Sequence, residues 1–192
     1  QGAGVKPILG ADVLLSDQEE GTATQLVLLA ADLKGYKNLT QLISRAYLEG
    51  QRQAVPIIDK SWLSTHSEGL IALSGGRGGE VGVALVSGRD ADAEKALRQM
   101  MAIFPDRFYL ELQRTHRADE EDYIHSAVAL AQRCECPVVA TNDVRFIKSS
   151  EFEAHEARVC IYEGRALDDP RRERRYSDSQ YLKSPEEMAE LF

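Results

Sequence analysis

Residues 138–146, Val-Val-Ala-Thr-Asn-Asp-Val-Arg-Phe, decide the fold. An apolar run that ends in polar residues is typical of a core strand in an α/β protein, and side chains at that strand end face the ligand crevice. Asp143 and Arg145 are two residues apart, so both point to the same side of an extended chain. A carboxylate and a histidine at this spacing could share a metal, but Arg145 carries a fixed positive charge and no lone pair for a cation.

The composition of the 192-residue chain is that of an ordinary globular protein, with 43% hydrophobic and 28% charged residues. A formal net charge of −8 argues against unaided, non-specific binding to nucleic acid. No apolar run has the length of a membrane span, so we expect no membrane contact. The three cysteines, Cys134, Cys136 and Cys160, have no framework spacing, which favours a reducing cytoplasm.

Strand-like apolar runs alternate with segments of helical spacing. Three segments repeat apolar residues every three or four positions, at 39–47, 93–104 and 124–131, and Asp90 is placed to cap the second. Strands that alternate with helices predict an α/β fold with a parallel sheet or barrel. The strand-like runs lie at residues 7–9, 13–15, 25–31, 70–74, 108–112 and 138–141.

The pattern changes after Phe146. A helix is expected at 151–162, then a charged loop, then a short helix at 184–192 in which Ser184 and Glu187 have the spacing of a capping box.

No linker rich in Pro or Gly divides the chain. We therefore predict a single domain over residues 1–192, with 147–192 as a C-terminal extension of helices and a loop. The chain starts at Gln1 without an initiator Met, so we expect it to be a piece of a longer protein.

Three motifs allow more than one interpretation. The glycine-rich residues 75–79 could hold a phosphate, but they lack the ending of a P-loop, so a tight turn is favoured. Residues 171–175, Arg-Arg-Glu-Arg-Arg, could contact DNA phosphates or an acidic partner, or be a solvated loop paired with Asp168 and Asp169. Cys134 and Cys136 resemble half a zinc site, but no second pair follows, so we interpret them as small residues at a helix end.

Six collinear segments resemble the polymerase-and-histidinol-phosphatase (PHP) domain of the bacterial DNA polymerase III alpha subunit, in its proteobacterial form. The resemblance covers essentially the whole chain. It implies a distorted (β/α)7-type PHP barrel, here without its first strand or strands, because the family's opening His-x-His strand would precede Gln1. The segments are GVKPILGAD (4–12), LVLLAADLKGYKNL (26–39), GLIALSG (69–75), FPDRFYLEL (104–112), ATNDVRF (140–146) and LKSPEEM (182–188).

Metal-competent relatives bind a trinuclear cluster, and the resemblance locates their ligand positions in this chain. Only the two aspartates keep a side chain suited to a hard cation, and His116 lies one residue out of register. We therefore expect no catalytic, cofactor-binding or metal-binding residue, and we hypothesise that Arg145 pairs with Asp143 or Asp12. The vestigial positions are Asp12, Gln25, Gly76, Thr115, Asp143 and Arg145.

The resemblance implies a non-catalytic module of a replicative DNA polymerase that docks a separate proofreading exonuclease and supports other replicase subunits in the cytoplasm. The parent chain would bind DNA and extend it with deoxynucleoside triphosphates and Mg²⁺. The alternative is an active metal-dependent phosphoesterase or 3′–5′ exonuclease. A third reading, a free-standing enzyme like histidinol phosphatase, fits the closing segment 182–188 poorly.

Overall fold

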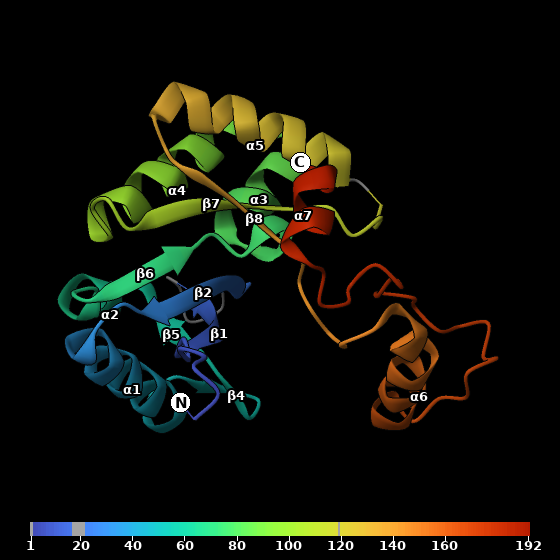
Figure 1. The fold of residues 1–192 in the computed structure, drawn as a ribbon. Helices are drawn as coiled ribbons and strands as arrows, with labels where there is room; N and C mark the ends of the chain where they lie inside the picture. Colours follow the sequence, from blue (N-terminus) through green and yellow to red (C-terminus); the bar gives the residue numbers. More distant parts are fainter. Residues whose placement is uncertain (1, 17–21, 119) are drawn as a thin grey trace. The chain divides into compact units, whose positions relative to one another are not determined.

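The computed structural model describes residues 2–16, 22–118 and 120–192 (Figure 1). Residues 1, 17–21 and 119 of the predicted domain lie outside the described part. The elements are β1 (Gly10–Ser16), β2 (Thr24–Ala30), α1 (Leu33–Leu48), β3 (Gln51–Arg52), β4 (Val55–Pro56), β5 (Ile58–Asp59), α2 (Lys60–His66), β6 (Leu70–Leu73), the 3-10 turn η1 (Gly76–Gly78), α3 (Glu80–Val86), α4 (Asp90–Ile103), β7 (Phe108–Gln113), α5 (Glu120–Cys134), β8 (Val138–Thr141), η2 (Ser149–Glu151), α6 (Phe152–Glu163) and α7 (Pro185–Leu191).

Within the described residues, one sheet has the strand order β5-β1-β2-β6-β7-β8, and β3 and β4 form a small separate ladder. The α/β class is confirmed, and the strands with flanking helices are consistent with the predicted barrel, whose sheet is open with β5 and β8 at its edges. β1–β5 and β6–β7 are parallel, as predicted for strands that alternate with helices, whereas β1–β2 and β2–β6 are antiparallel, so the sheet is mixed. Only seven residues separate β1 from β2, too few for the crossover that a parallel pair needs.

The chain divides into two compact units. The first contains Gln1–Glu111 and His125–Val139, and the second contains Leu112–Ile124 and Ala140–Phe192. Compact units can belong to one domain, so the single-domain assignment stays a prediction.

In the first unit, α1 begins at a defined cap and packs against β2 and β6. The Asp32 side chain accepts a hydrogen bond from the Gly35 backbone N–H at 2.8 Å, which satisfies one of the free donors of the first turn. A side chain at Gly35 could not fit, because a Cβ there would lie 1.8 Å from the carbonyl oxygen of Gly69. The helix therefore approaches the loop before β6 backbone to backbone.

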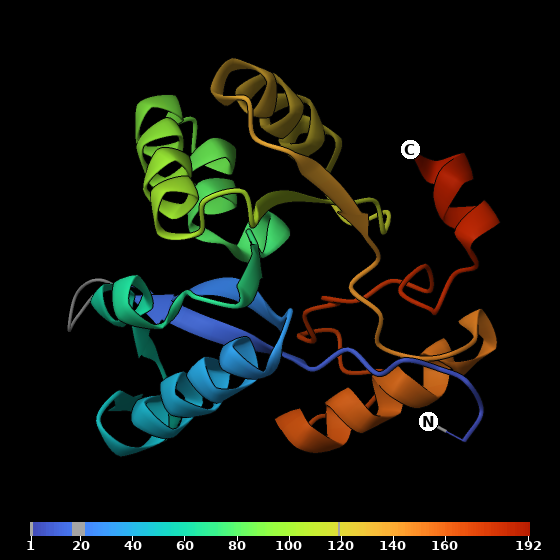
Figure 2. The ribbon, with the colours of Figure 1, turned by 60° about the vertical axis from the view of Figure 1, so that its left-hand side comes forward.

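The same unit holds an apolar core between its sheet and helices. The helices α3 and α4 pack side by side (Figure 2), and α4 buries the apolar face predicted for residues 93–104. Asp90 is the first residue of α4 rather than its cap, which is Arg89 with no side-chain hydrogen bond, so that prediction was wrong by one position. Core side chains of this unit with 1% exposure or less are Leu28, Leu42, Ile58, Leu63, Leu70, Ala72, Ala93, Leu97, Phe104, Leu110, Ala127 and Leu130.

In the second unit, residues 145–147 run beside residues 180–182 in a parallel bridge between Phe146 and Tyr181. The Arg145 N–H donates to the Gln180 carbonyl at 2.8 Å, and the Leu182 N–H donates to the Phe146 carbonyl at 3.0 Å. The two predicted helices are present as α6 and α7, and the capping box of Ser184 and Glu187 is confirmed.

One further expectation was tested by the structure. Residues 7–9 are not a strand; the first strand, β1, starts at Gly10. No helix among the described residues is long and apolar enough to cross a membrane.

Candidate functional site

Asp143, which follows β8, is contacted by three polar side chains of the second unit. Its backbone has φ of 43°, a left-handed conformation that Asp tolerates better than most residues. The Arg145 Nη2 lies 2.6 Å from Asp143 Oδ1, and Arg117 Nη1 lies 3.1 Å from Oδ2. Gln180 Nε2 also donates to Oδ2, at 2.8 Å. Of the two predicted partners for Arg145, Asp143 is confirmed.

Thr115 belongs to the same network. It is fully buried, and its hydroxyl donates to Glu120 Oε1 at 2.5 Å while its N–H donates to Oε2 at 2.6 Å. Arg117 Nε donates to Thr115 Oγ1 at 2.8 Å and to Glu120 Oε1 at 3.2 Å. Glu120 is only 3% exposed, so its carboxylate is held by charge-assisted and backbone hydrogen bonds at the start of α5.

Sequence reasoning missed Arg117, which joins the two halves of this network. Its guanidinium contacts Asp143 and Glu120, which are 26 and 3 residues away in sequence. The only sequence signal for this contact was the position of Arg117 three residues before Glu120. An Arg and a Glu at that spacing are common on protein surfaces, so the spacing alone did not indicate a buried network. His116, by contrast, is exposed, with Nδ1 2.8 Å from Ser179 Oγ.

Gln25 and Gly76 come together in the first unit. The glycine-rich segment is a tight turn, as predicted: φ is 77° at Gly75 and 55° at Gly76. The Gln25 side chain lies over this turn, since a Cβ at Gly78 would lie 2.6 Å from Gln25 Oε1. The buried side chain of Glu111 accepts a hydrogen bond from the Gly75 N–H at 3.1 Å and so stabilises the turn, a role that the sequence did not indicate.

Asp12 lies elsewhere in the first unit. It is an exposed residue of β1, opposite Val27 of β2. It borders a cavity of about 340 Å³ between β1, α1 and β4, whose lining is mainly apolar and includes Ile43, Tyr47 and Val55.

The arrangement around Asp143 does not fit a divalent cation. Oδ2 already accepts hydrogen bonds from Arg117 and Gln180, and Oδ1 is ion-paired with Arg145, so two guanidinium groups would repel a metal ion at this carboxylate. Thr115 uses its hydroxyl proton on Glu120, and Gly76 offers no side chain. Among the residues that the structure describes, no group of three or more His, Cys, Asp or Glu side chains could hold a metal ion.

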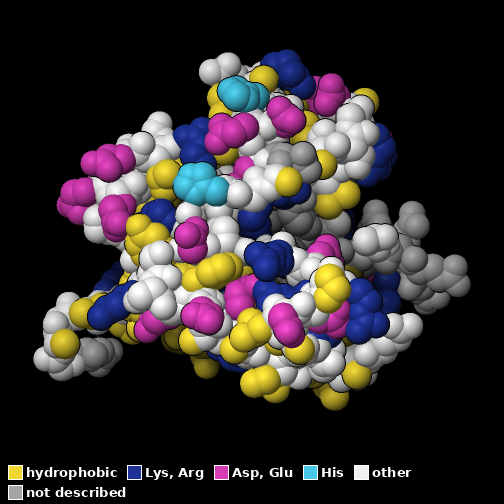
Figure 3. Space-filling model, turned by 90° about the vertical axis from the view of Figure 1, so that its right-hand side faces the viewer, with side chains coloured by type: hydrophobic (Ala, Val, Ile, Leu, Met, Phe, Trp, Pro, Cys, Tyr) yellow, Lys and Arg dark blue, Asp and Glu magenta, His cyan; other side chains and the backbone are white. Residues whose placement is uncertain are grey.

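Three of the four arginines in the basic segment 171–175 pair with acidic groups of their own unit. Arg171 Nη2 lies 2.8 Å from Asp169, and Arg175 Nε lies 3.0 Å from Glu173. Arg172 forms an ion pair with Glu156 in which both side chains are buried. On the face drawn in Figure 3, basic, acidic and hydrophobic side chains are intermixed.

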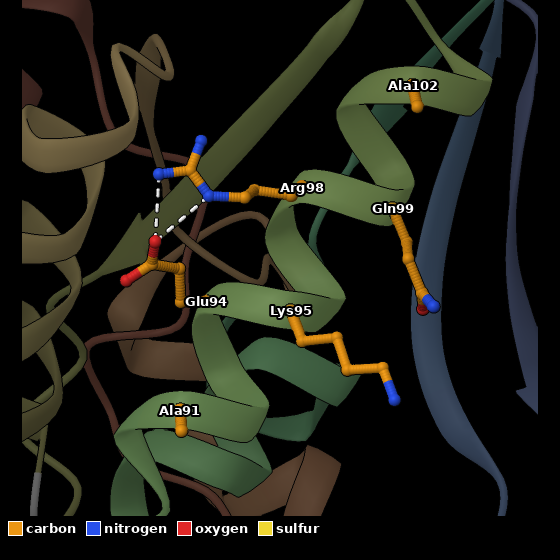
Figure 4. A pocket seen from close by; sticks show the side chains of 6 residues that line it. All are labelled: Ala91, Glu94, Lys95, Arg98, Gln99 and Ala102. Carbon is orange, nitrogen blue, oxygen red and sulfur yellow. Dashed lines mark hydrogen bonds and ion pairs between the residues drawn. The ribbon is translucent and has the colours of Figure 1, made fainter.

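Two other sequence features have structural explanations. Cys134 ends α5, and both Cys134 and Cys136 are free and buried, as expected for small residues at a helix end. A shallow surface pocket on α4 is lined by Glu94, Lys95 and Arg98, and Arg98 Nη2 donates to Glu94 Oε1 at 2.8 Å along the helix (Figure 4). This i, i+4 ion pair is exposed, and its acid and base neutralise each other.

Comparison with known proteins defines the class. The family model of the PHP domain matches residues 1–115, more than half of the chain. The chain belongs to the PHP domain family.

Its relatives share one name, DNA polymerase III subunit alpha. The chain is 61% identical over 192 residues to the DNA polymerase III subunit alpha of Pseudomonas aeruginosa. It is 55% identical over 196 residues to the protein of the same name in Escherichia coli K12, and 55% identical over 190 residues to that of Vibrio cholerae. These matches cover 98–100% of this chain but only 16–17% of the length of each relative.

Proposed function

We propose that this chain is a non-catalytic PHP module of a replicative DNA polymerase, which serves as a scaffold and docks a proofreading exonuclease. The polymerase assignment is supported by the shared name of the relatives and by their full coverage of this chain. In this proposal the parent polypeptide extends DNA in the cytoplasm with Mg²⁺ and deoxynucleoside triphosphates, together with other replicase subunits. No residue of the present chain transfers a nucleotide.

The observation that carries the scaffold role is the ion-pair network at Asp143. Arg145 and Arg117 bring two positive charges to a carboxylate that in a metal-bearing PHP site would face a cation. Guanidinium groups hold a carboxylate with directed hydrogen bonds and perform no Lewis-acid chemistry. The network therefore supports a conformational role for these residues rather than a hydrolytic one.

Binding of the purified proofreading exonuclease to the 192-residue chain tests this function. Isothermal titration calorimetry should detect a one-to-one complex. The same preparations, supplied with Mn²⁺ or Zn²⁺, should release no phosphate from p-nitrophenyl phosphate and no nucleotide from single-stranded DNA. Absence of binding together with metal-dependent hydrolysis would favour the active phosphoesterase or exonuclease instead.

A further inference from the structure

Residues 165–176, which we call the return segment, follow α6 and run back beside it (Figure 1). None of these residues, all of which the structure describes, belongs to a helix or a strand, so side chains must hold the segment in place. Arg172 reaches α6 through the buried ion pair with Glu156. A second contact, of Arg175 with Glu163, is long at 3.9 Å, and its arginine is 58% exposed, so it adds little.

The other anchor is an aromatic contact at the end of the return segment. The ring of Tyr176 packs edge-on against that of His155, with 4.7 Å between the centroids, and the ring of Phe146 lies 5.5 Å from that of His155. His155 is only 7% exposed, and its Nδ1 is buried with no hydrogen-bond partner among the described residues. An imidazolium carries an N–H on both ring nitrogens, so protonation would create a buried donor without an acceptor.

The charges that act on His155 also oppose its protonation. Arg158 lies on α6 itself, and Arg145 lies in the segment after β8. Burial, and then the charges of Arg158 and Arg145, hold the pKa of His155 below its ordinary value of 6.5. From the return segment, the ring that faces His155 is that of Tyr176, a phenol without charge near neutral pH.

The two carboxylates that could offset a charge on this ring already have partners. Glu156, next to His155 in the sequence, pairs with Arg172, and Asp143 pairs with Arg145. A protonated His155 would therefore be a buried charge without a counter-ion, which is costly. Movement of Tyr176 away from the ring would admit water and relieve that cost.

We propose that the return segment is a pH-sensitive strap, closed on α6 while His155 is neutral and released when His155 takes up a proton. The change reaches the Asp143 network, because the Arg145 guanidinium lies over the Tyr176 ring at 5.6 Å and also pairs with Asp143. Release of Tyr176 removes this cation–π contact from Arg145. The strap is a property of the second unit and does not depend on the docking of an exonuclease.

NMR spectroscopy of the 192-residue chain between pH 7.5 and pH 5.5 tests the strap. The nuclear Overhauser effect between the rings of His155 and Tyr176 should be present at pH 7.5. It should fall severalfold by pH 5.5, with the same midpoint as the chemical shift of the His155 ring. The effect between Phe146 and Phe152, whose ring centroids lie 6.0 Å apart, is the internal control and should persist, because neither ring belongs to the return segment.

Three variants isolate the contribution of His155. His155→Phe keeps an aromatic ring and cannot be protonated, so its contact with Tyr176 should not change with pH. Arg158→Gln removes an exposed cation that opposes the charged ring, so it should keep more of the His155–Tyr176 contact at pH 5.5 than the wild type does. His125→Phe is the matched control and should behave as the wild type does, because His125 is exposed.

Three results would overturn the strap. The first is a His155–Tyr176 contact that persists after the His155 ring has titrated. The second is the loss of the Phe146–Phe152 contact at the same pH, which would mean that the second unit unfolds as a whole. The third is a contact in Arg158→Gln with the same pH dependence as in the wild type, a measurement that holds even if His155→Phe does not fold.

Discussion

Arg117 links Asp143 to Glu120, with Nη1 3.1 Å from the carboxylate of Asp143 and Nε 3.2 Å from that of Glu120. One guanidinium therefore contacts two carboxylates, one just after β8 and the other at the start of α5. The exposed fractions of the three side chains are 25% for Arg117, 18% for Asp143 and 3% for Glu120. Removal of Arg117 would take one ion-pair partner from each of these two carboxylates, which are largely buried from solvent.

Arg117→Ala should lower the free energy of unfolding by about 2–3 kcal/mol, because it leaves a buried carboxylate without its cation. Arg145→Ala should cost less, about 1 kcal/mol, because its side chain is 37% exposed and the pair is partly screened by water. Urea denaturation measures both. Arg98→Ala, which breaks only the exposed pair with Glu94, is the control and should change little. An unchanged midpoint in Arg117→Ala would contradict a stabilising role for the network.

Glu120→Gln should also destabilise the second unit. The amide keeps the size of the side chain but replaces one acceptor oxygen with a donor, which then faces the Thr115 N–H or hydroxyl. We expect a loss of about 2 kcal/mol, in the range for a buried hydrogen bond to a charged group. Glu121→Gln is the comparison, since Glu121 is 57% exposed, and it should be nearly neutral. Equal melting temperatures for the two variants would refute this role for Glu120.

Gly35→Ala should destabilise the first unit, because its Cβ would lie 1.8 Å from the Gly69 carbonyl oxygen. The backbone on both sides must separate, and overpacking of this kind typically costs about 1–3 kcal/mol. Gly2→Ala is the control, since a Cβ there meets nothing within 4 Å. Thermal denaturation followed by circular dichroism measures the difference, and a Gly35→Ala variant as stable as the control would show that the approach of α1 is looser than described.

His155 should make stability depend on pH. Burial, followed by the charges of Arg158 and Arg145, holds the pKa of His155 below its ordinary value of 6.5. Its ring packs edge-on against that of Tyr176, with 4.7 Å between the ring centroids. The His155 Nδ1 is buried with no hydrogen-bond partner among the described residues. The unfolded chain therefore takes up this proton at higher pH than the folded chain does. The stability contributed by neutral His155 is present above pH 6.5 and is lost as the pH falls from 6.5 through the folded pKa.

Urea denaturation at pH 7.5 and pH 5.5 measures this effect. The wild-type chain should lose more stability on acidification than the His155→Phe variant, which keeps an aromatic ring at this position but cannot be protonated. His125→Phe is the control, because His125 is exposed. Identical pH dependence in wild type and His155→Phe would show that His155 is accommodated in its charged form.

The sequence predicted the bounds of β8 to the residue, because the apolar run ends in polar residues. The expectation of a core strand was wrong, since β8 lies at an edge of the sheet and its residues are exposed or half-buried. The sequence also led to the hypothesis that Arg145 pairs with Asp143 or Asp12, and the structure shows the pair with Asp143, although the backbone at Asp143 is left-handed rather than extended. It could not predict Arg117 or Gln180 at the same carboxylate, because these approach from segments 26 and 37 residues away. Such contacts depend on how the chain folds back, and neither residue belongs to a periodic pattern.

The sequence pattern also did not determine which neighbouring strands pair in parallel and which pair antiparallel. Alternating strands and helices favour parallel pairing, and β6–β7, separated by α3 and α4, follows that rule. β1 and β2 are separated by a short connection instead, so their pairing is antiparallel. The length of that connection was therefore a signal in the sequence for antiparallel pairing of these two strands.

A titration of Mn²⁺ into the 192-residue chain, followed by electron paramagnetic resonance of the free ion, tests the central idea most directly. If arginines have taken the place of metal at Asp143, the free-ion signal should match that of Asp143→Asn at every concentration, with no stoichiometric uptake. Uptake of one or more Mn²⁺ ions per chain that is lost in Asp143→Asn would contradict it.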